Sequence, residues 1–311
     1  MKILPLAAAA AVLLPAADLR IGIIGTDTSH AGAFTAMLND PSNKNYIPGA
    51  RVVAAFKGGS ADLESSASRV DKYAEELASK YGVEIVPSIQ ALLPKVEAIL
   101  LESVDGRKHL PQFREIAKAG KPVFIDKPLA STLPDAREIA RIGRENGVRW
   151  FSASSLRFSR GIPALKQPEL RGAVVWGPGP TDKTHQLDLA WYGIHSVEIL
   201  YTFLGRGCVE VTRVSGANGD VVSGRWSDGR LGTVVLDNDY AGFGATTFAK
   251  RKSLVSGADF YTGYQDLVAE IIKFFKGGPP PVEENETLEM FAFMDAAQRS
   301  KESGGKPVAL K

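Results

Sequence analysis

The first half of the chain alternates short apolar runs with longer segments of helical periodicity. The apolar runs, rich in β-branched residues, occupy residues 19–25, 51–56, 83–86, 98–101 and 122–125. Runs of this kind predict strands that are buried on both faces of a sheet. The segments between them have the apolar spacing of helices, at residues 31–39, 67–81, 89–93, 110–119 and 133–146. This alternation predicts a Rossmann-like, doubly wound parallel sheet in a first domain of residues 18–150.

After Trp150 the pattern becomes that of hairpins. Apolar runs separated by Gly, Asn and Asp occupy residues 173–176, 209–214, 221–226, 231–236 and 246–249. The dipeptides Asn218-Gly219 and Asp228-Gly229 favour two-residue turns because both positions tolerate positive φ. Helical segments are expected at residues 187–204, 264–275 and 287–303. We therefore predict a second, α+β domain at residues 151–311, with an open, mainly antiparallel sheet that serves substrate binding or oligomerisation.

The N-terminal segment has the layout of a Sec-type secretory signal peptide. Lys2 precedes an apolar run from Ile3 to Leu14, and the small residues Ala16 and Ala17 follow. We expect cleavage after residue 17 and export to the periplasm, with a cytoplasmic location if the signal is not used. A retained anchor and a plain Ala-rich helix are the alternatives. No other segment is apolar enough to span a membrane, so none is expected after cleavage.

The composition excludes several classes of protein. Lys and Arg number 37 against 35 Asp and Glu, a formal charge of +2 that offers no footprint for nucleic acid. Cys208 is the single cysteine, so an internal disulfide and a Cys-rich zinc site are excluded, and we expect a small buried side chain there. No metalloprotease-like histidine spacing occurs, and no metal site is predicted.

The loop after the first strand is an altered dinucleotide-binding motif. It reads Gly25-Thr26-Asp27-Thr28-Ser29-His30, where a G-x-G-x-x-G sequence would let the backbone approach a pyrophosphate. Only the first glycine is present. Ser29 and the free amides of the helix could still hold the phosphates, with Asp27 nearby as an unfavourable like charge. Alternatively, Asp27 and Ser29 cap the helix.

The end of the second strand lacks the acidic residue that usually binds the ribose hydroxyls. Lys57 stands there and would suit a 2′-phosphate, which favours NADP over NAD. The alternative is a solvated loop lysine.

Several motifs resemble those of the glucose–fructose oxidoreductase, inositol dehydrogenase and rhizopine-catabolism (Gfo/Idh/MocA) family. The segment from Ala119 to Leu129 resembles A-G-K-x-V-x-x-E-K-P-L, with Asp126 in place of Glu. Residues 192–198 resemble G-x-H-x-x-D, although Trp191 stands where an Asp is often found. Ser103, His109 and Arg157-Phe158 take the places of further family elements.

The resemblance implies a divergent, exported oxidoreductase that uses NAD or NADP on a sugar or cyclitol hydroxyl. It also implies a homo-oligomer assembled through the outer face of the second sheet. The residues expected to bind the cofactor are Gly25, Thr26, Asp27, Ser29, His30, Lys57, Ser103, His109, Asp126 and Lys127.

Two side chains are candidates for proton transfer. Lys127 ends a buried strand before Pro128 and is expected at the crevice, where a desolvated ammonium can exchange a proton with a substrate hydroxyl. A structural pair with Asp126 is the alternative. His195 is the second candidate, with a satisfied buried histidine as its alternative.

A polar and aromatic helix face is predicted around His195. Asp188, Trp191, Tyr192 and Glu198 lie seven, four, three and three residues from it, which places them on one face as a sugar-binding wall with Arg157 nearby. Glu198 is expected to orient the imidazole.

These residues favour an NAD(P)-dependent oxidoreductase of sugars or cyclitols. The alternative is an exported carbohydrate-binding protein, or a lyase or hydrolase that traps its cofactor, without ordinary redox turnover. The altered glycine loop favours this second hypothesis. The first requires Lys127 and His195 to lie within about 10 Å of each other, because one hydroxyl must reach both.

Overall fold

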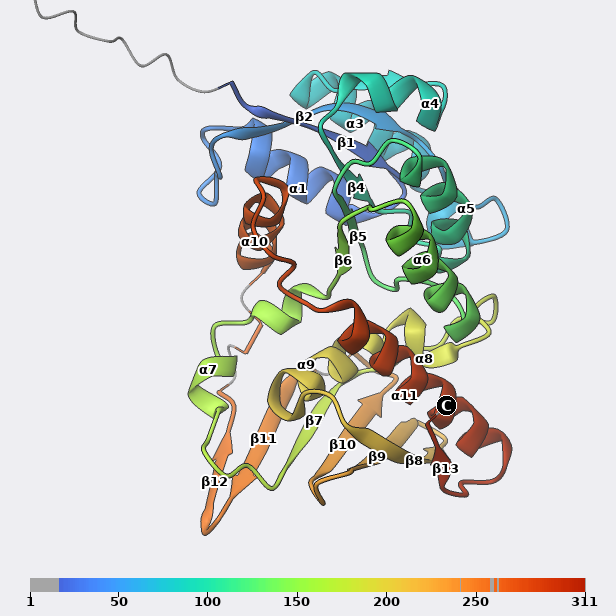
Figure 1. Ribbon diagram of the computed structural model, residues 1–311, viewed down its shortest axis with the longest axis vertical. Coiled ribbons are helices and arrows are strands. Elements are labelled where there is room, and N and C mark those ends of the chain that lie inside the picture. Colours follow the sequence, from blue (N-terminus) through green and yellow to red (C-terminus); the bar gives the residue numbers. More distant parts are fainter. Residues whose placement is uncertain (1–16, 241, 258–259, 262, 311) are drawn as a thin grey trace, which may run out of the picture.

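A six-stranded parallel sheet forms the core of the first domain. The computed structural model describes residues 17–310 except 241, 258–259 and 262, so the expected signal peptide lies almost wholly outside the described residues. The strands are β1 (Leu19–Ile24), β2 (Ala50–Phe56), β3 (Glu84–Val86), β4 (Ala98–Leu101), β5 (Val123–Ile125) and β6 (Trp150–Ser152). Their order is β3-β2-β1-β4-β5-β6, with every pair parallel (Figure 1). The predicted doubly wound fold is confirmed, and the order reverses between β1 and β4, where ligands bind in such sheets.

Helices connect these strands as the apolar spacing predicts. They are α1 (Ser29–Asn39), α2 (Glu64–Ala67), α3 (Val70–Tyr81), α4 (Ile89–Leu92), α5 (Gly106–Ala117) and α6 (Leu133–Glu145). The 3-10 turns η1 (Leu93–Lys95) and η2 (Ser155–Phe158) complete the connections. Between β2 and α3 the chain makes a longer excursion, residues 58–69, which we call the covering segment.

A seven-stranded mixed sheet forms the second domain. Its strands are β7 (Gly172–Pro178), β8 (Cys208–Gly216), β9 (Gly219–Trp226), β10 (Leu231–Asp237), β11 (Gly244–Ala249), β12 (Lys252–Val255) and β13 (Val308–Ala309). Their order is β12-β11-β7-β10-β9-β8-β13, and only the β10–β7 pair is parallel. The mainly antiparallel prediction is therefore confirmed.

Helices cover one face of this sheet. They include α7 (Ile162–Leu165), α8 (Asp188–Trp191), α9 (Ile194–Leu204) and α11 (Glu284–Glu302). The prediction of one helix over residues 187–204 is wrong, because the chain turns at Tyr192 and Gly193 between α8 and α9. Gly193 is a weak helix former, and its missing side chain leaves room for Leu236, which lies 3.1 Å from where a Cβ would stand.

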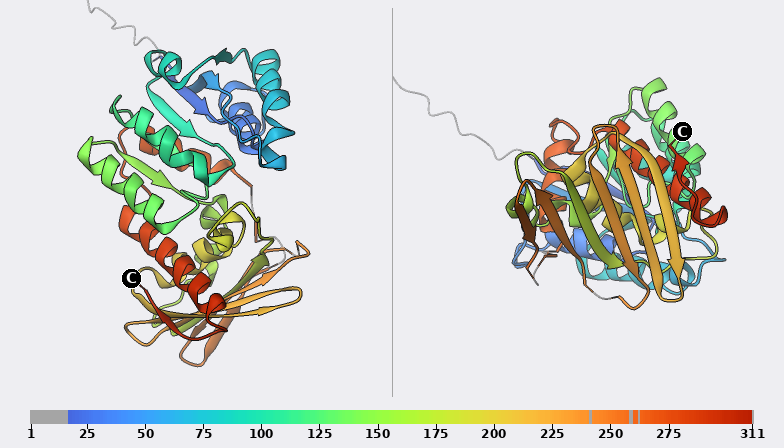
Figure 2. Two further views of the ribbon diagram at one scale, coloured as in Figure 1. Left: turned by 90° about the vertical axis from the view of Figure 1, so that its right-hand side faces the viewer. Right: turned by 90° about the horizontal axis from the view of Figure 1, so that it is seen from below.

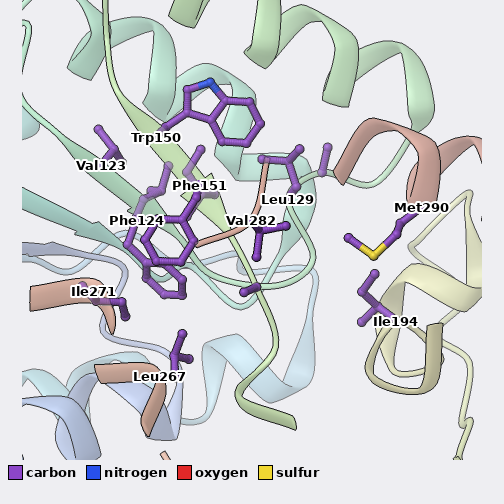
Figure 3. Close-up of a cluster of buried hydrophobic side chains, with 14 of the residues drawn as sticks. Val123, Phe124, Leu129, Trp150, Phe151, Ile194, Leu267, Ile271, Val282 and Met290 are labelled. Carbon is purple, nitrogen blue, oxygen red and sulfur yellow. The ribbon is translucent and has the colours of Figure 1, made fainter. Parts of the chain in front are cut away.

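The two domains share a hydrophobic core. Helix α10 (Gln265–Phe275) follows the second sheet in sequence but lies beside α1 against the first (Figure 1). Figure 3 shows side chains of α10 next to those of β5 and β6, and the rings of Phe151 and Phe274 meet edge to face at 5.0 Å. The expected boundary between residues 150 and 151 falls inside β6.

The opposite face of the second sheet carries no helix (Figure 2). Its exposed large apolar side chains include Val214, Val221, Leu231, Val235, Phe248 and Val255. No helix among the described residues is long and apolar enough to cross a membrane.

Candidate active site

A cavity of about 470 Å³ opens where the two domains meet, at the carboxyl ends of β1 and β5. Both the start of α1 and the α8–α9 turn contribute to its wall. Its lining includes Thr28, Ser29, His30, Arg69, Lys127, Ser155, Trp191, Tyr192, His195, Tyr240, Phe243, Tyr261 and Tyr264. The volume suits a single sugar-sized molecule with room for part of a second group.

Lys127 and His195 line this one cavity, and both lie close to the ring of Tyr192. The Lys127 amine lies 5.8 Å from the centre of that ring, and the His195 ring lies 5.0 Å from it. Burial lowers the pKa of Lys127, although the neighbouring Asp126 carboxylate opposes the shift.

His195 is held as a neutral imidazole. Burial holds its pKa well below the usual value, and the positive charges of Lys127 and His30 act in the same direction. Its Nδ1 lies 2.7 Å from the Ser154 hydroxyl. Glu198 accepts a hydrogen bond from the Ser154 backbone amide instead of contacting the ring. The carboxylate therefore positions the loop that holds the histidine.

His30 contacts Asp126 at the other side of the cavity. The distance from Nδ1 to Oδ2 is 2.7 Å, and the two side chains are 12% and 3% exposed. Burial acts to raise the pKa of Asp126, but His30 and Lys127 outweigh it and the net shift is downward. Asp126 thus pairs with the histidine, and its contribution near Lys127 is electrostatic.

Asp27 points away from any phosphate position. Its Oδ2 accepts a hydrogen bond from Ser66 Oγ at 2.5 Å, and its Oδ1 accepts one from the Val104 amide at 3.2 Å. Thr28, not Asp27 or Ser29, caps α1, since the Thr28 hydroxyl accepts from the His30 amide. Both expectations for Asp27 are therefore wrong, because a hydroxyl on the covering segment and an amide beyond β4 satisfy its carboxylate. Burial raises its pKa.

Local packing and backbone conformation require a glycine at position 25. Its φ is +95°, and a Cβ there would lie 2.2 Å from the Ser103 amide nitrogen. The covering segment lies on the same spot, since a Cβ on Gly58 would be 3.3 Å from the Gly25 Cα. Ser60 Oγ then donates to Asp105 at 2.5 Å, and Arg107 pairs with both Asp105 and Asp62.

The fit of a nicotinamide dinucleotide therefore differs along the crevice. At the cavity, the start of α1 and Lys127 leave room for a ring and a phosphate. Beyond it, residues 58–60 follow β2 closely and lie against Gly25, at the strand edge where the adenosine ribose binds in such folds. The covering segment therefore approaches the expected adenosine position.

Other residues expected to bind a cofactor hold loops together. Thr26 Oγ donates to the Val70 carbonyl at 2.9 Å, and Ser103 Oγ donates to Gln112 at 2.9 Å. The His109 ring lies between the Ser103 and Pro128 carbonyls.

Lys57 pairs with Asp71 at 2.8 Å, at the exposed end of β2. Its ammonium therefore forms an ion pair with a side chain of α3.

Three residues expected in the sugar-binding wall lie outside it. Arg157 forms a buried ion pair with Glu198 at 2.5 Å. Asp188 pairs with Arg213 at 2.6 Å and with Lys301 at 2.9 Å. The break between α8 and α9 separates Asp188 from the helix of His195, whereas Glu198 lies on that helix and is held by Arg157 and the Ser154 amide. Trp191 and Tyr192 do line the cavity.

Glu102 lies beneath the crevice. Burial, reinforced by the negative charges of Asp126 and Asp27, raises its pKa well above the usual value. Neither carboxyl oxygen has a hydrogen-bond partner among the described residues. Its environment therefore favours the protonated form of this carboxyl group.

No motif or periodicity in the sequence predicts a role for Ser154, Tyr240, Phe243 or Tyr264. Each lies in a connection without a motif, and the packing of α9, β11 and α10 brings it to the cavity. Among the described residues, no group of three or more His, Cys, Asp or Glu could hold a metal ion. Cys208 is buried, which raises the pKa of its thiol to about 12.

A parallel sheet with a crevice at its switch point, joined to an open mixed sheet beside a cavity with titratable side chains, defines a two-domain architecture. Residues 19–154 match the model of an oxidoreductase family with an NAD-binding Rossmann fold, the Gfo/Idh/MocA family. This match covers the first domain, less than half of the chain.

Relatives by sequence match the first half only. An inositol 2-dehydrogenase of Agrobacterium fabrum is 31% identical over 153 residues, which cover 48% of this chain and 40% of that protein. A 1,5-anhydro-D-fructose reductase of Ensifer adhaerens is 29% identical over 126 residues, 40% of this chain and 38% of that protein. The match spans about two-fifths of the length of these relatives.

Solved structures share the whole fold. The myo-inositol dehydrogenase of Lactobacillus casei, in complex with NAD(H) and myo-inositol, has a TM-score of 0.73 and 17% identity, covering 94% of this chain and 97% of that one. GenD2 from gentamicin A biosynthesis, in complex with NAD, has a TM-score of 0.76 and 16% identity, covering 99% and 100%.

Proposed function

We propose that this protein is an oxidoreductase that acts on a hydroxyl of a sugar, sugar derivative or cyclitol, with a nicotinamide cofactor. The observation that carries the proposal is the placement of Lys127 and His195 on one cavity, each close to the Tyr192 ring. The match to an NAD-binding oxidoreductase family supports it.

The two residues have complementary roles in this proposal. The Lys127 ammonium, with its pKa lowered by burial, can stabilise negative charge on the substrate oxygen and exchange a proton with it. His195 is neutral and can donate or accept a hydrogen bond at Nε2, because Nδ1 faces Ser154. A bound nicotinamide ring would supply the hydride acceptor. Lys127, Thr28 and Ser29 are the residues that would hold its reacting half.

The aromatic lining supports a polyhydroxylated substrate. Tyr192, Trp191, Tyr240 and Tyr264 combine flat apolar faces with hydrogen-bonding edges, as sugar rings require. Tyr192 is edge-on to both His195 and Tyr240, so its orientation is fixed by neighbours on both sides.

A second candidate function follows from the covering segment. With residues 58–60 against Gly25, an acid–base enzyme that does not exchange a free dinucleotide would use the same Lys127 and His195. It would be a lyase or hydrolase of carbohydrate, or a binding protein.

One experiment separates the two candidates. The purified protein is denatured and the released small molecules are identified by mass spectrometry, and the native protein is titrated with NAD+ and NADP+ by calorimetry. Exchangeable binding, together with NADH or NADPH formation from a panel containing myo-inositol and aldoses, supports the oxidoreductase. A tightly retained cofactor, or none, with no reduction of added NAD+ or NADP+, supports the second candidate.

Three finer features belong to this proposal. Export rests on the apolar residues 3–14, and N-terminal sequencing from the native host should return a start near Asp18. A preference for NADP rests on Lys57, which would have to leave Asp71 to reach a 2′-phosphate. A homo-oligomer rests on the apolar side chains of the helix-free sheet face, and sedimentation analysis tests it.

A further inference from the structure

Two departures from the family motifs meet each other in the fold. His30 stands where the dinucleotide loop has its third glycine, and Asp126 stands where the family has glutamate. They lie 96 residues apart in the chain, yet Nδ1 and Oδ2 are 2.7 Å apart. The ring of His30, at a position where the motif has glycine, thus contacts the carboxylate of Asp126, at a position where the motif has the longer glutamate.

We infer that His30 is a further catalytic acid–base residue of the cavity and that Asp126 is its positioning residue. The inference rests on the proposed function, since it concerns the same cavity. His30 lines that cavity from the first turn of α1, opposite the helix that carries His195. The carboxylate lies behind the ring, so Nε2 remains available to a substrate.

The surroundings fix the ring. Its plane stacks on Phe34 with centroids 5.4 Å apart, and the edge of Tyr264 meets it at 4.7 Å. Asp126, which is 2% exposed, accepts from Nδ1–H and so selects the tautomer with a bare Nε2. Three contacts therefore hold the imidazole in one orientation, as an acid–base residue requires.

The other histidines lack this combination. His109 is buried between backbone carbonyls, and His185 lies 3.4 Å from Asp182 and 3.7 Å from Asp105 with a fully buried side chain. Of the His–carboxylate contacts among the described residues, that of His30 is the shortest and the only one that opens on the cavity.

The contact divides the proton chemistry between two histidines. The Nδ1 of His30 has a carboxylate as its partner, whereas that of His195 has a hydroxyl, and burial disfavours the protonated form of His195. The charged and titratable groups that face His30 are Asp126, Lys127, His195 and Tyr264. In the oxidation, the substrate O–H bond breaks and an N–H bond forms at His30 Nε2, while the carbon-bound hydrogen leaves as hydride to the nicotinamide acceptor.

The first test needs no turnover. Long-range ¹H–¹⁵N spectra of the full chain report the tautomer of each histidine, and the chain has only four. Comparison with His30→Gln assigns the signals of His30. We expect the Nδ1–H tautomer in the wild type and its loss in Asp126→Asn, because an amide can donate to Nδ1. The matched control is Asp182→Asn, which changes a histidine contact outside the cavity and should leave His30 unchanged.

The second test uses turnover with the polyol panel. His30→Gln and Asp126→Asn should each lower kcat by about 10²–10³-fold with KM changed less than threefold, within the range of general acid–base catalysis. Asp126→Asn keeps the shape of the site if His30→Gln fails to fold. A wild-type Nε2–H tautomer, or full kcat in His30→Gln, would overturn the inference. Absence of polyol oxidation in the wild type would instead overturn the proposed function, and the tautomer spectra would still decide the role of Asp126.

Discussion

The two ends of the Rossmann crevice lie along the same strand edge but carry different kinds of side-chain contact. At the adenosine end, serines of the covering segment join Asp27 and Asp105, and every named carboxylate there has a partner. At the cavity end, Lys127, His195 and His30 have pKa values or contacts suited to proton transfer, and they face open space. One strand edge thus carries both carboxylates that neighbouring side chains bind and titratable groups that line a cavity.

The largest expected effect tests the cavity end. Lys127→Met and His195→Asn should each lower turnover of the polyol panel by about 10²–10⁴-fold, because each removes a proton-transfer group. The double variant should lose far less than the product of the two single losses, since residues that act on one hydroxyl are not additive.

Melting temperature is the control for this pair. Removal of the buried Lys127 ammonium should leave it unchanged or raise it, because the desolvation cost disappears. A multiplicative double variant would show that the two residues act on separate steps.

Opening the adenosine end should have the next largest effect. Asp27→Gly removes the partner of Ser66 and restores a glycine of the dinucleotide motif. We expect NAD+ to bind about tenfold more tightly by calorimetry, which corresponds to about 1.4 kcal/mol. Ser68→Ala is the control, because its hydroxyl contacts only the Glu64 carbonyl of the same turn. Equal affinity in the wild type and Asp27→Gly would mean that this contact does not hold the segment against the cofactor.

Glu102 and Asp105 should make the free energy of unfolding depend on pH in opposite directions. The folded pKa of Glu102 is raised, so the native state binds a proton that the unfolded chain has released. Its contribution therefore falls as pH rises from the unfolded pKa through the folded one, by at most about 1.4 kcal/mol per pH unit. In Glu102→Gln this decline should disappear from urea unfolding curves.

Asp105 provides the comparison. Burial acts to raise its pKa, but hydrogen bonds from Arg107 and Ser60 lower it to about 2. Its contribution is present above the unfolded value near 3.8 and is lost as pH falls toward 2. Asp105→Asn should flatten only this acid limb, and a flattening near neutral pH would contradict the assignment.

The smallest expected effect concerns one hydrogen bond. Ser60→Ala removes one hydrogen bond to Asp105, which keeps Arg107 and the more distant His185, and should cost about 1 kcal/mol locally. Amide hydrogen exchange in residues 58–69 should then quicken about fivefold. Ser79→Ala, which removes a hydroxyl contact within α3, should not change exchange in the covering segment.

The sequence predicted the fold well because periodicity reports burial. Each of the five predicted strands of the first sheet appears within two residues of its expected ends, since both faces are covered and most positions are apolar. The short strands β6, β12 and β13 were missed, because edge strands of few residues carry little apolar pattern.

The site was harder to predict, because it depends on tertiary contacts. Lys127 and His195 were found from motifs that follow strand and helix ends. Asp188 was misplaced, since spacing on one continuous helix was assumed and the chain breaks at Gly193. Glu198 was misplaced because its ion pair with Arg157 and its bond to the Ser154 amide are tertiary contacts. The contact between His30 and Asp126 joins residues 96 positions apart, which no local pattern reports.

The buried Cys208 makes the natural chain a ready background for distance spectroscopy. With a thiol pKa of about 12 and no access to reagent, it should resist nitroxide labels at neutral pH. Cysteines introduced at the exposed Ala67 and Lys118 would then carry the only spin labels, one on the covering segment and one at the end of α5. Pulsed electron–electron resonance between them could follow the segment as ligands are added, without any change to the residues that contact it.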